Sequence, residues 1–132
     1  MRYALYLLLC ALPAPLPATD AAAALAERVA LARAEQASFQ PDPARARQWF
    51  STAHANDWSC ASCHTRDPRQ PGRHVITGRA LQPLSPLAAP SRFTDAAKTE
   101  KWFKRNCQDV LDRPCTAAEQ ADVLAYLLQP GA

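Results

Sequence analysis

The sequence lacks several features that would point to common protein classes. Its single methionine is Met1, so the body of the chain offers no methionine sulfur as a metal ligand. Beyond the N-terminal region, no apolar run approaches the roughly 18 residues that a membrane-spanning helix needs, which excludes a span after processing. The formal net charge is only +3, which gives no support to nucleic-acid binding. No convincing strand pattern is present, which argues against a thioredoxin-like βαβ unit.

The most informative stretch is Cys60-Ala61-Ser62-Cys63-His64. Cys-x-x-Cys-His is the attachment signature of a c-type haem, in which the thiols bond to the porphyrin vinyl groups and the imidazole takes one axial position on the iron. We therefore predict one haem c, held covalently through Cys60 and Cys63, with His64 as an iron ligand. The chain of 132 residues fits one small domain, and a covalently held macrocycle adds a large apolar body to its core.

The N-terminus has the pattern of a secretory signal peptide. Arg2 supplies one positive charge, an apolar run covers residues 4–12, and Ala18 is a small residue before a polar break. We expect cleavage after Ala18 and a periplasmic location. Export agrees with haem ligation, which in bacteria takes place outside the cytoplasm, where thiols meet oxidising conditions.

The remaining cysteines lead to a second prediction. Cys10 leaves with the signal and two cysteines take the haem, so Cys107 and Cys115 remain of the five. In an oxidising compartment this arithmetic favours a disulfide, worth roughly 2.5 kcal/mol for so short a loop. A zinc site built from four cysteines is the weaker alternative, because it needs reduced thiols and leaves His64 without a role.

Helical signals dominate the rest of the chain. Alanine, leucine, glutamate and arginine fill residues 20–37, where apolar residues recur at helical spacing. Asp42 and Pro43 have the N-cap and first-turn chemistry of a helix that reaches about Ala53. Thr94 is expected to cap a helix over residues 95–105, and a capping box at Thr116 begins a last helix that ends before residue 130.

Residues 65–90 contain five prolines and two glycines, so they cannot form a regular helix. We expect a loop that wraps around the haem edge, with Arg73, Arg79 and Arg92 as candidates for binding the propionates; solvated loop charges are the alternative for each. The predicted fold is all-α, a small class I cytochrome c with helices around one haem. Its parts are a signal peptide (1–18), an N-terminal helical extension (19–39) and a monohaem cytochrome c domain (40–132).

The second axial position has no methionine to fill it. His54 and His74 lie close in sequence to the attachment motif, where a lone histidine is more often a surface or propionate-contacting residue than a ligand. Lysine must first lose a proton to bind iron. These side chains remain open alternatives.

The helix expected at residues 95–105 offers another candidate, Asn106. At 100° per residue, one arc of this helix carries Thr99, Trp102, Phe103 and Asn106, and another carries the basic residues Lys98, Lys101, Lys104 and Arg105. We count Trp102 and Phe103 with the haem-binding residues and Asn106 as a candidate iron ligand. Asparagine also commonly terminates helices, so a purely structural role is the alternative.

The stretches "SCASCHTRDP", "TGRALQPLSP", "RFTD" and above all "KWFKRNC" at 101–107, followed by Cys115, resemble the sphaeroides haem protein family. That family consists of class I cytochromes c with an asparagine axial ligand. The resemblance covers nearly all of the chain after about residue 40. It implies that Asn106 ligates ferric iron and that the neighbouring Cys107 forms the disulfide with Cys115.

An amide oxygen is a hard, weak donor that suits ferric iron better than ferrous iron. Reduction is therefore expected to release Asn106 and open a position for dioxygen or nitric oxide. The resemblance implies the same behaviour, with oxygen binding and electron delivery by a dihaem cytochrome c. The alternatives are plain periplasmic electron transfer and an oxygen or nitric oxide sensor or carrier without turnover. All three describe an electron-transfer or ligand-binding haemoprotein rather than a dedicated enzyme.

Overall fold

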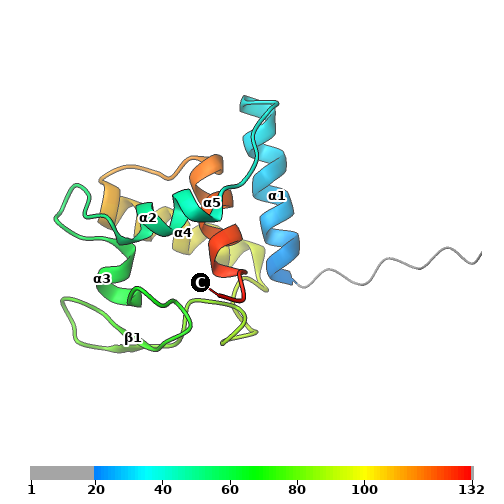
Figure 1. Ribbon diagram of the computed structural model, residues 1–132. Helices are drawn as coiled ribbons and strands as arrows, with labels where there is room; N and C mark the ends of the chain where they lie inside the picture. The colour runs from blue at the N-terminus through cyan, green and yellow to red at the C-terminus, as the bar shows by residue number, and fades with distance from the viewer. Residues whose placement is uncertain (1–19, 132) are drawn as a thin grey trace, which may run out of the picture.

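The computed structural model describes residues 20–131, and the predicted signal peptide, with its expected cleavage site after Ala18, lies outside that range. The elements are α1 (Asp20–Glu35), α2 (Pro43–Ser51), α3 (Cys60–His64), β1 (Gly72–Arg73), β2 (Ala80–Leu81), α4 (Ala96–Leu111) and α5 (Ala117–Leu127). Helices joined by long loops confirm the predicted all-α class (Figure 1). Within residues 20–131, no helix combines the length and the hydropathy that crossing a bilayer requires.

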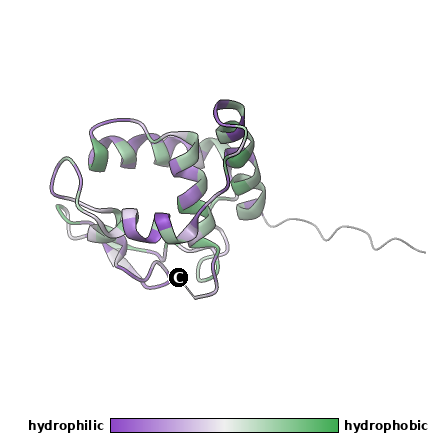
Figure 2. Cartoon of the chain, turned by 45° about the horizontal axis from the view of Figure 1, so that its top comes forward, coloured by the Kyte–Doolittle hydropathy of each residue, from purple (hydrophilic) through white to green (hydrophobic). Residues whose placement is uncertain are grey.

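The centre of the fold is the crossing of α2 and α5. Ala46 and Phe50, four residues apart on α2, face Tyr126 and Leu127 on α5, and all four are buried. The rings of Phe50 and Tyr126 meet edge-on, with centroids 5.6 Å apart and planes inclined by 62°. Figure 2 shows hydrophilic and hydrophobic residues interspersed along the helices, as expected when one side of each helix faces a core.

Helix α1 also packs against α5. Its contact forms a second apolar cluster, in which Ala32, Phe39 and Ala121 are buried and Leu25 and Val29 are partly buried. The apolar positions expected from the sequence therefore do face the core. Figure 1 shows α1 beside α5, at the opposite side of the molecule from α3.

Local capping signals are confirmed at two helices. The Asp42 carboxylate accepts hydrogen bonds from the backbone N–H groups of Ala44 and Arg45, and Pro43 occupies the first turn of α2. At α5, Thr116 and Glu119 form the reciprocal capping box. Both signals act within four residues of the chain, which is why the sequence alone reveals them.

Helix α4 differs from the prediction at both ends. Its N-cap is Asp95, which accepts from Lys98 N at 2.8 Å, whereas Thr94 donates to the carbonyl of Ser91. The helix continues to Leu111 instead of ending near residue 105, because no proline or glycine interrupts it before Pro114. Asn106 consequently lies inside the helix, and the alternative role of Asn106 as a helix terminator is wrong.

The segment 65–90 is not entirely irregular. Gly72 pairs with Leu81 and Arg73 with Ala80 in a short antiparallel ladder, which the sequence did not predict. Two residues per strand are too few for a recognisable alternating pattern. At the far end of this hairpin Gly78 adopts a φ of 67°, a conformation that glycine tolerates without steric cost.

Candidate haem site

Helix α3 holds the Cys-x-x-Cys-His motif as little more than one helical turn. Ser59 and Ser62 cap it reciprocally: Ser62 N donates to Ser59 Oγ at 3.1 Å, and Ser59 N donates to Ser62 Oγ at 2.9 Å. Because residues three apart lie on the same side of a helix, this turn presents Cys60 and Cys63 together. Both are free cysteines and partly buried.

His64 has the environment of a metal-binding imidazole. Its Nδ1 atom is buried and has no hydrogen-bond partner within the described residues 20–131. Burial, and secondarily the nearby charge of Arg92, lower the pKa of His64 to about 4. The ring is therefore neutral at pH 7, the form that carries a lone pair for a metal.

Two further features describe the surroundings of α3. Burial raises the pKa of the Cys60 thiol to about 12, so this thiol stays protonated. The backbone of Gly72 lies so close to α3 that a Cβ at that position would overlap the carbonyl oxygen of Cys63. The hairpin thus packs closely against the C-terminal end of the attachment turn.

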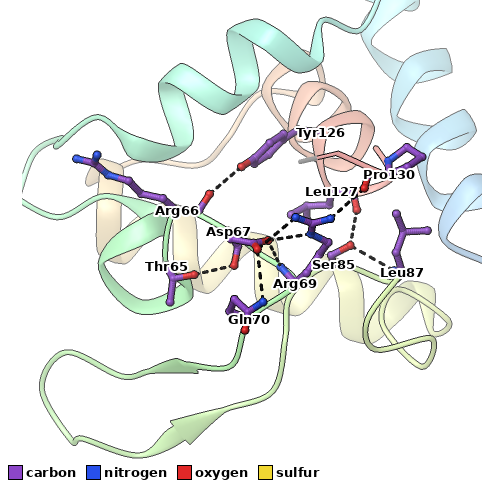
Figure 3. Close-up of polar contacts among 10 residues, drawn as sticks. All are labelled: Thr65, Arg66, Asp67, Arg69, Gln70, Ser85, Leu87, Tyr126, Leu127 and Pro130. Carbon is purple, nitrogen blue, oxygen red and sulfur yellow. Dashed lines mark hydrogen bonds and ion pairs between the residues drawn. The ribbon is translucent and has the colours of Figure 1, made fainter.

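The chain that leaves His64 is fastened to the C-terminal helix. The Tyr126 hydroxyl donates to the carbonyl of Arg66 at 3.2 Å, and the buried hydroxyl of Ser85 donates to the carbonyl of Leu127 at 2.7 Å (Figure 3). These bonds fix both ends of the wrapping loop against α5. Sequence reasoning missed Ser85, because no local pattern marks a serine that becomes fully buried by a tertiary contact.

The three arginines proposed for the propionates differ in their placement. Arg92 is half-buried and donates from Nε to Pro83 O and from Nη2 to Gln82 O, both at 2.9 Å. Its charge lies near enough to His64 to contribute to the lowered pKa of the imidazole. Arg73 instead donates to Gly78 O at 2.6 Å within the hairpin, and Arg79 is exposed. Arg92 is therefore the one that the structure brings to the attachment motif.

The two spare histidines are engaged in local contacts. His54 Nε2 lies 3.0 Å from the carbonyl oxygen of Trp49, and the centroids of the His54 and Trp49 rings are 5.0 Å apart. His74 Nδ1 accepts from the backbone N–H groups of Ile76 and Thr77 and thereby stabilises the hairpin turn. In each case one ring nitrogen already has a backbone partner.

The arc of α4 that was expected to face the haem is neither fully buried nor fully exposed. Phe103 is half-buried and stacks on Phe93, with ring centroids 6.5 Å apart. Trp102 is 37% exposed, and the Arg105 guanidinium lies 5.6 Å from the centre of its ring. Asn106 is exposed, and its side chain has no polar partner among residues 20–131.

Cys107 and Cys115 form the predicted disulfide, with Cα atoms 5.5 Å apart. This bond rules out a zinc site built from the four cysteines. In the described part of the chain, no group of three or more histidine, cysteine and acidic side chains is arranged to hold a metal ion. The disulfide joins α4 to the start of α5 directly beside Asn106.

Comparison with known proteins places this site in context. A family model described as a domain of unknown function (DUF1924) matches residues 36–127. Cytochrome c'' from Methylophilus methylotrophus is 40% identical over 79 residues, which is 60% of this chain and 55% of that protein. Cytochrome c-type protein SHP from Cereibacter sphaeroides is 49% identical over 69 residues, 52% of this chain and 53% of that protein.

Solved structures extend the similarity. The crystal structure of oxidised cytochrome c'' from Methylophilus methylotrophus gives a TM-score of 0.78 at 30% identity, covering 84% of this chain and 94% of that one. The structure of oxidised SHP, described as an oxygen-binding cytochrome c, gives 0.72 at 38% identity, covering 83% and 96%. A solution structure of cytochrome c'' that addresses haem-ligand detachment gives 0.76 at 29% identity, covering 86% and 96%.

These comparisons confirm the fold and the resemblance noted in the sequence. In sequence alignment, the chain spans about half the length of the two curated relatives, 55% of cytochrome c'' and 53% of SHP.

Proposed function

We propose that this chain, a c-type cytochrome of the sphaeroides haem protein family, is an exported monohaem protein that accepts electrons and binds a small diatomic ligand after reduction. The chain also matches the DUF1924 family model. The proposed diatomic is dioxygen or nitric oxide. The proposed electron donor is another cytochrome, of the dihaem type that the family resemblance implies.

In this proposal Cys60 and Cys63 would hold the haem through thioether bonds, and His64 would bind its iron. The haem would supply one-electron redox chemistry and an iron able to bind a small ligand. Of the three arginines proposed for the propionates, Arg92 is the one whose charge acts on His64, and it would be the candidate to neutralise a propionate. Trp102 and Phe103 would contact the haem from α4.

One observation carries the choice of Asn106 as the second axial ligand. Its side chain is exposed inside a continuous helix and has no polar partner within the described residues, whereas His54 and His74 each use a ring nitrogen locally. The adjacent disulfide fixes the backbone on which the amide is carried. An amide that has no other polar partner and is carried on a fixed backbone would be suited to bind ferric iron and to dissociate from ferrous iron.

The amide of Asn106 has two chemical roles in this scheme. Its oxygen is a weak, hard donor that matches ferric iron and is poorly matched to the softer ferrous state. Its NH₂ group is a hydrogen-bond donor, which could interact with a small ligand bound to the iron. The relatives support such a scheme, because SHP is described as oxygen-binding and cytochrome c'' has been studied for haem-ligand detachment.

A reductive titration followed by visible spectroscopy tests the proposed function. We expect a six-coordinate ferric spectrum, loss of one axial ligand on reduction, and rapid binding of carbon monoxide to the reduced protein. Retention of both ligands on reduction, with no carbon monoxide complex, would contradict the proposal and indicate plain electron transfer. A dioxygen complex that persists without oxidising the iron would instead favour a carrier or sensor.

The basic side of α4 predicts how the electron donor docks. Lys98, Lys101 and Lys104 are exposed and form no ion pair within residues 20–131. They can attract an acidic partner through long-range electrostatic attraction, which dissolved salt screens. We expect Lys101→Glu to slow reduction by such a donor about fivefold at low salt, with the difference disappearing as ionic strength rises.

A matched control makes this result specific. Arg47→Glu changes the net charge equally at an exposed position on α2. It should affect the rate less than Lys101→Glu does. Equal slowing in both variants, or reduction rates that do not depend on salt, would show that the lysines form only a solvated surface.

A further inference from the structure

Arg28 is a charged residue in an unusual place. It lies in the middle of α1, and its side chain is only 9% exposed. Its Nη2 atom lies 2.9 Å from a carboxylate oxygen of Glu100 on α4, and its buried Nε has no hydrogen-bond partner in the described range. The Glu100 side chain is 56% exposed, so the pair lies at the edge of the core, where the largely buried guanidinium favours keeping its countercharge in place.

This contact matters because α4 packs less closely on the other elements. Helices α1 and α2 pack against α5, whereas no comparable packing joins α4 to another helix or strand within residues 20–131. Of its sixteen residues only Thr99 and Cys107 are buried. Near its C-terminal end it is held by the Cys107 to Cys115 disulfide and by Asn56 Nδ2, which donates to Asp109 O at 2.7 Å.

We propose that Arg28 is a positioning residue, which holds the N-terminal half of α4 through Glu100 and so fixes the orientation in which Asn106 is presented to the haem iron. This inference rests on the proposed function. Glu100 precedes Asn106 by six residues, about 9 Å along a helix. Phe103 packs on Phe93, and the disulfide and Asn56 hold α4 towards its C-terminal end. The contact at Glu100 adds a restraint nearer to the N-terminal end of the helix.

The proposal also gives the N-terminal helix a role in the chemistry. Residues 20–35 contribute no member of the attachment motif and no predicted ligand. Through Arg28 they nevertheless reach the helix that carries Asn106. The apolar packing of α1 on α5 holds Arg28 in place. The ion pair therefore restrains the position of α4 relative to the core.

The test uses the haem-loaded protein with two readouts. In Arg28→Gln we expect amide hydrogen exchange in the first two turns of α4 to become about threefold faster or more. We also expect the ferric spectrum to gain a five-coordinate or water-bound component, intermediate between the unmodified protein and Asn106→Ala. Arg28→Lys should restore much of both properties, and Glu100→Gln should reproduce the Arg28→Gln effects without changing α1.

Glu27→Gln is the control, because it alters an exposed charge on the same helix. It should change neither readout. The inference is overturned if Arg28→Gln speeds exchange in α4 but leaves the ferric spectrum unchanged while Asn106→Ala alters it, since the contact then does not position the ligand. If Asn106→Ala itself leaves the spectrum unchanged, the ligand assignment fails and this inference with it.

Discussion

Replacing Asn106 by alanine is expected to convert the ferric spectrum completely to that of a five-coordinate or water-bound haem, while covalent attachment stays intact. The amide oxygen is the proposed ligand, and alanine offers no donor atom. The substitution lies at an exposed position inside α4, and alanine is the best helix former, so the fold should lose no more than about 0.5 kcal/mol. A spectral change of this size with the helical content retained identifies a lost ligand rather than a damaged protein.

A second substitution at the same position sharpens the result. Asn106→His should keep six coordination in both oxidation states, because imidazole binds ferrous as well as ferric iron, and it should suppress oxygen binding. An unchanged ferric spectrum in Asn106→Ala would exclude the assignment. His54→Ala and His74→Ala would then show which imidazole holds the site, although both side chains have local contacts in the structure.

Removal of His64 is expected to abolish stable haem incorporation in the exported protein. Its imidazole is the proposed iron ligand. Among the described residues, its buried Nδ1 has no hydrogen-bond partner that would indicate another role for the ring. Replacing Cys60 or Cys63 by alanine should leave at most one thioether bond. Mass spectrometry of the exported protein reports attachment, and the spectrum of the reduced haem in pyridine distinguishes one thioether bond from two.

Two controls separate attachment from folding. Ser62→Ala removes one half of the reciprocal cap of α3 but leaves the motif complete, so it should still mature with haem. His74→Ala removes a histidine outside the motif and should do the same. Normal maturation and spectra in His64→Ala would show that the central interpretation of the attachment motif is wrong.

The features that the sequence predicts well are those encoded within a few residues. Asp42 and Pro43 start α2, and Thr116 and Glu119 start α5, because capping involves only the chain's own next turn. The pairing of Cys107 followed from the number of cysteines and the expected compartment. Such signals need no knowledge of distant neighbours.

The features that were missed depend on tertiary contacts or on weak stop signals. The sequence predicts an end of α4 near residue 105, whereas the helix continues to Leu111 and the break comes only before Pro114. Neither the burial of Arg28 nor that of Ser85 is visible in the sequence, since each is created by a partner more than forty residues away. Asn106 as a ligand rested on family resemblance, because an asparagine on a helix has many other uses.

The burial pattern of α4 has a consequence for how this site can change over evolutionary time. The buried core is built mainly by α1, α2 and α5, and α4 contributes little beyond Thr99 and Cys107. Substitutions on the exposed positions of α4, including position 106, therefore carry small penalties in folding stability. A lineage can exchange the residue at position 106, and with it the reactivity of the iron, without first acquiring compensating mutations in the core. The fold thus separates the part that must be conserved for stability from the part that is free to diversify in chemistry.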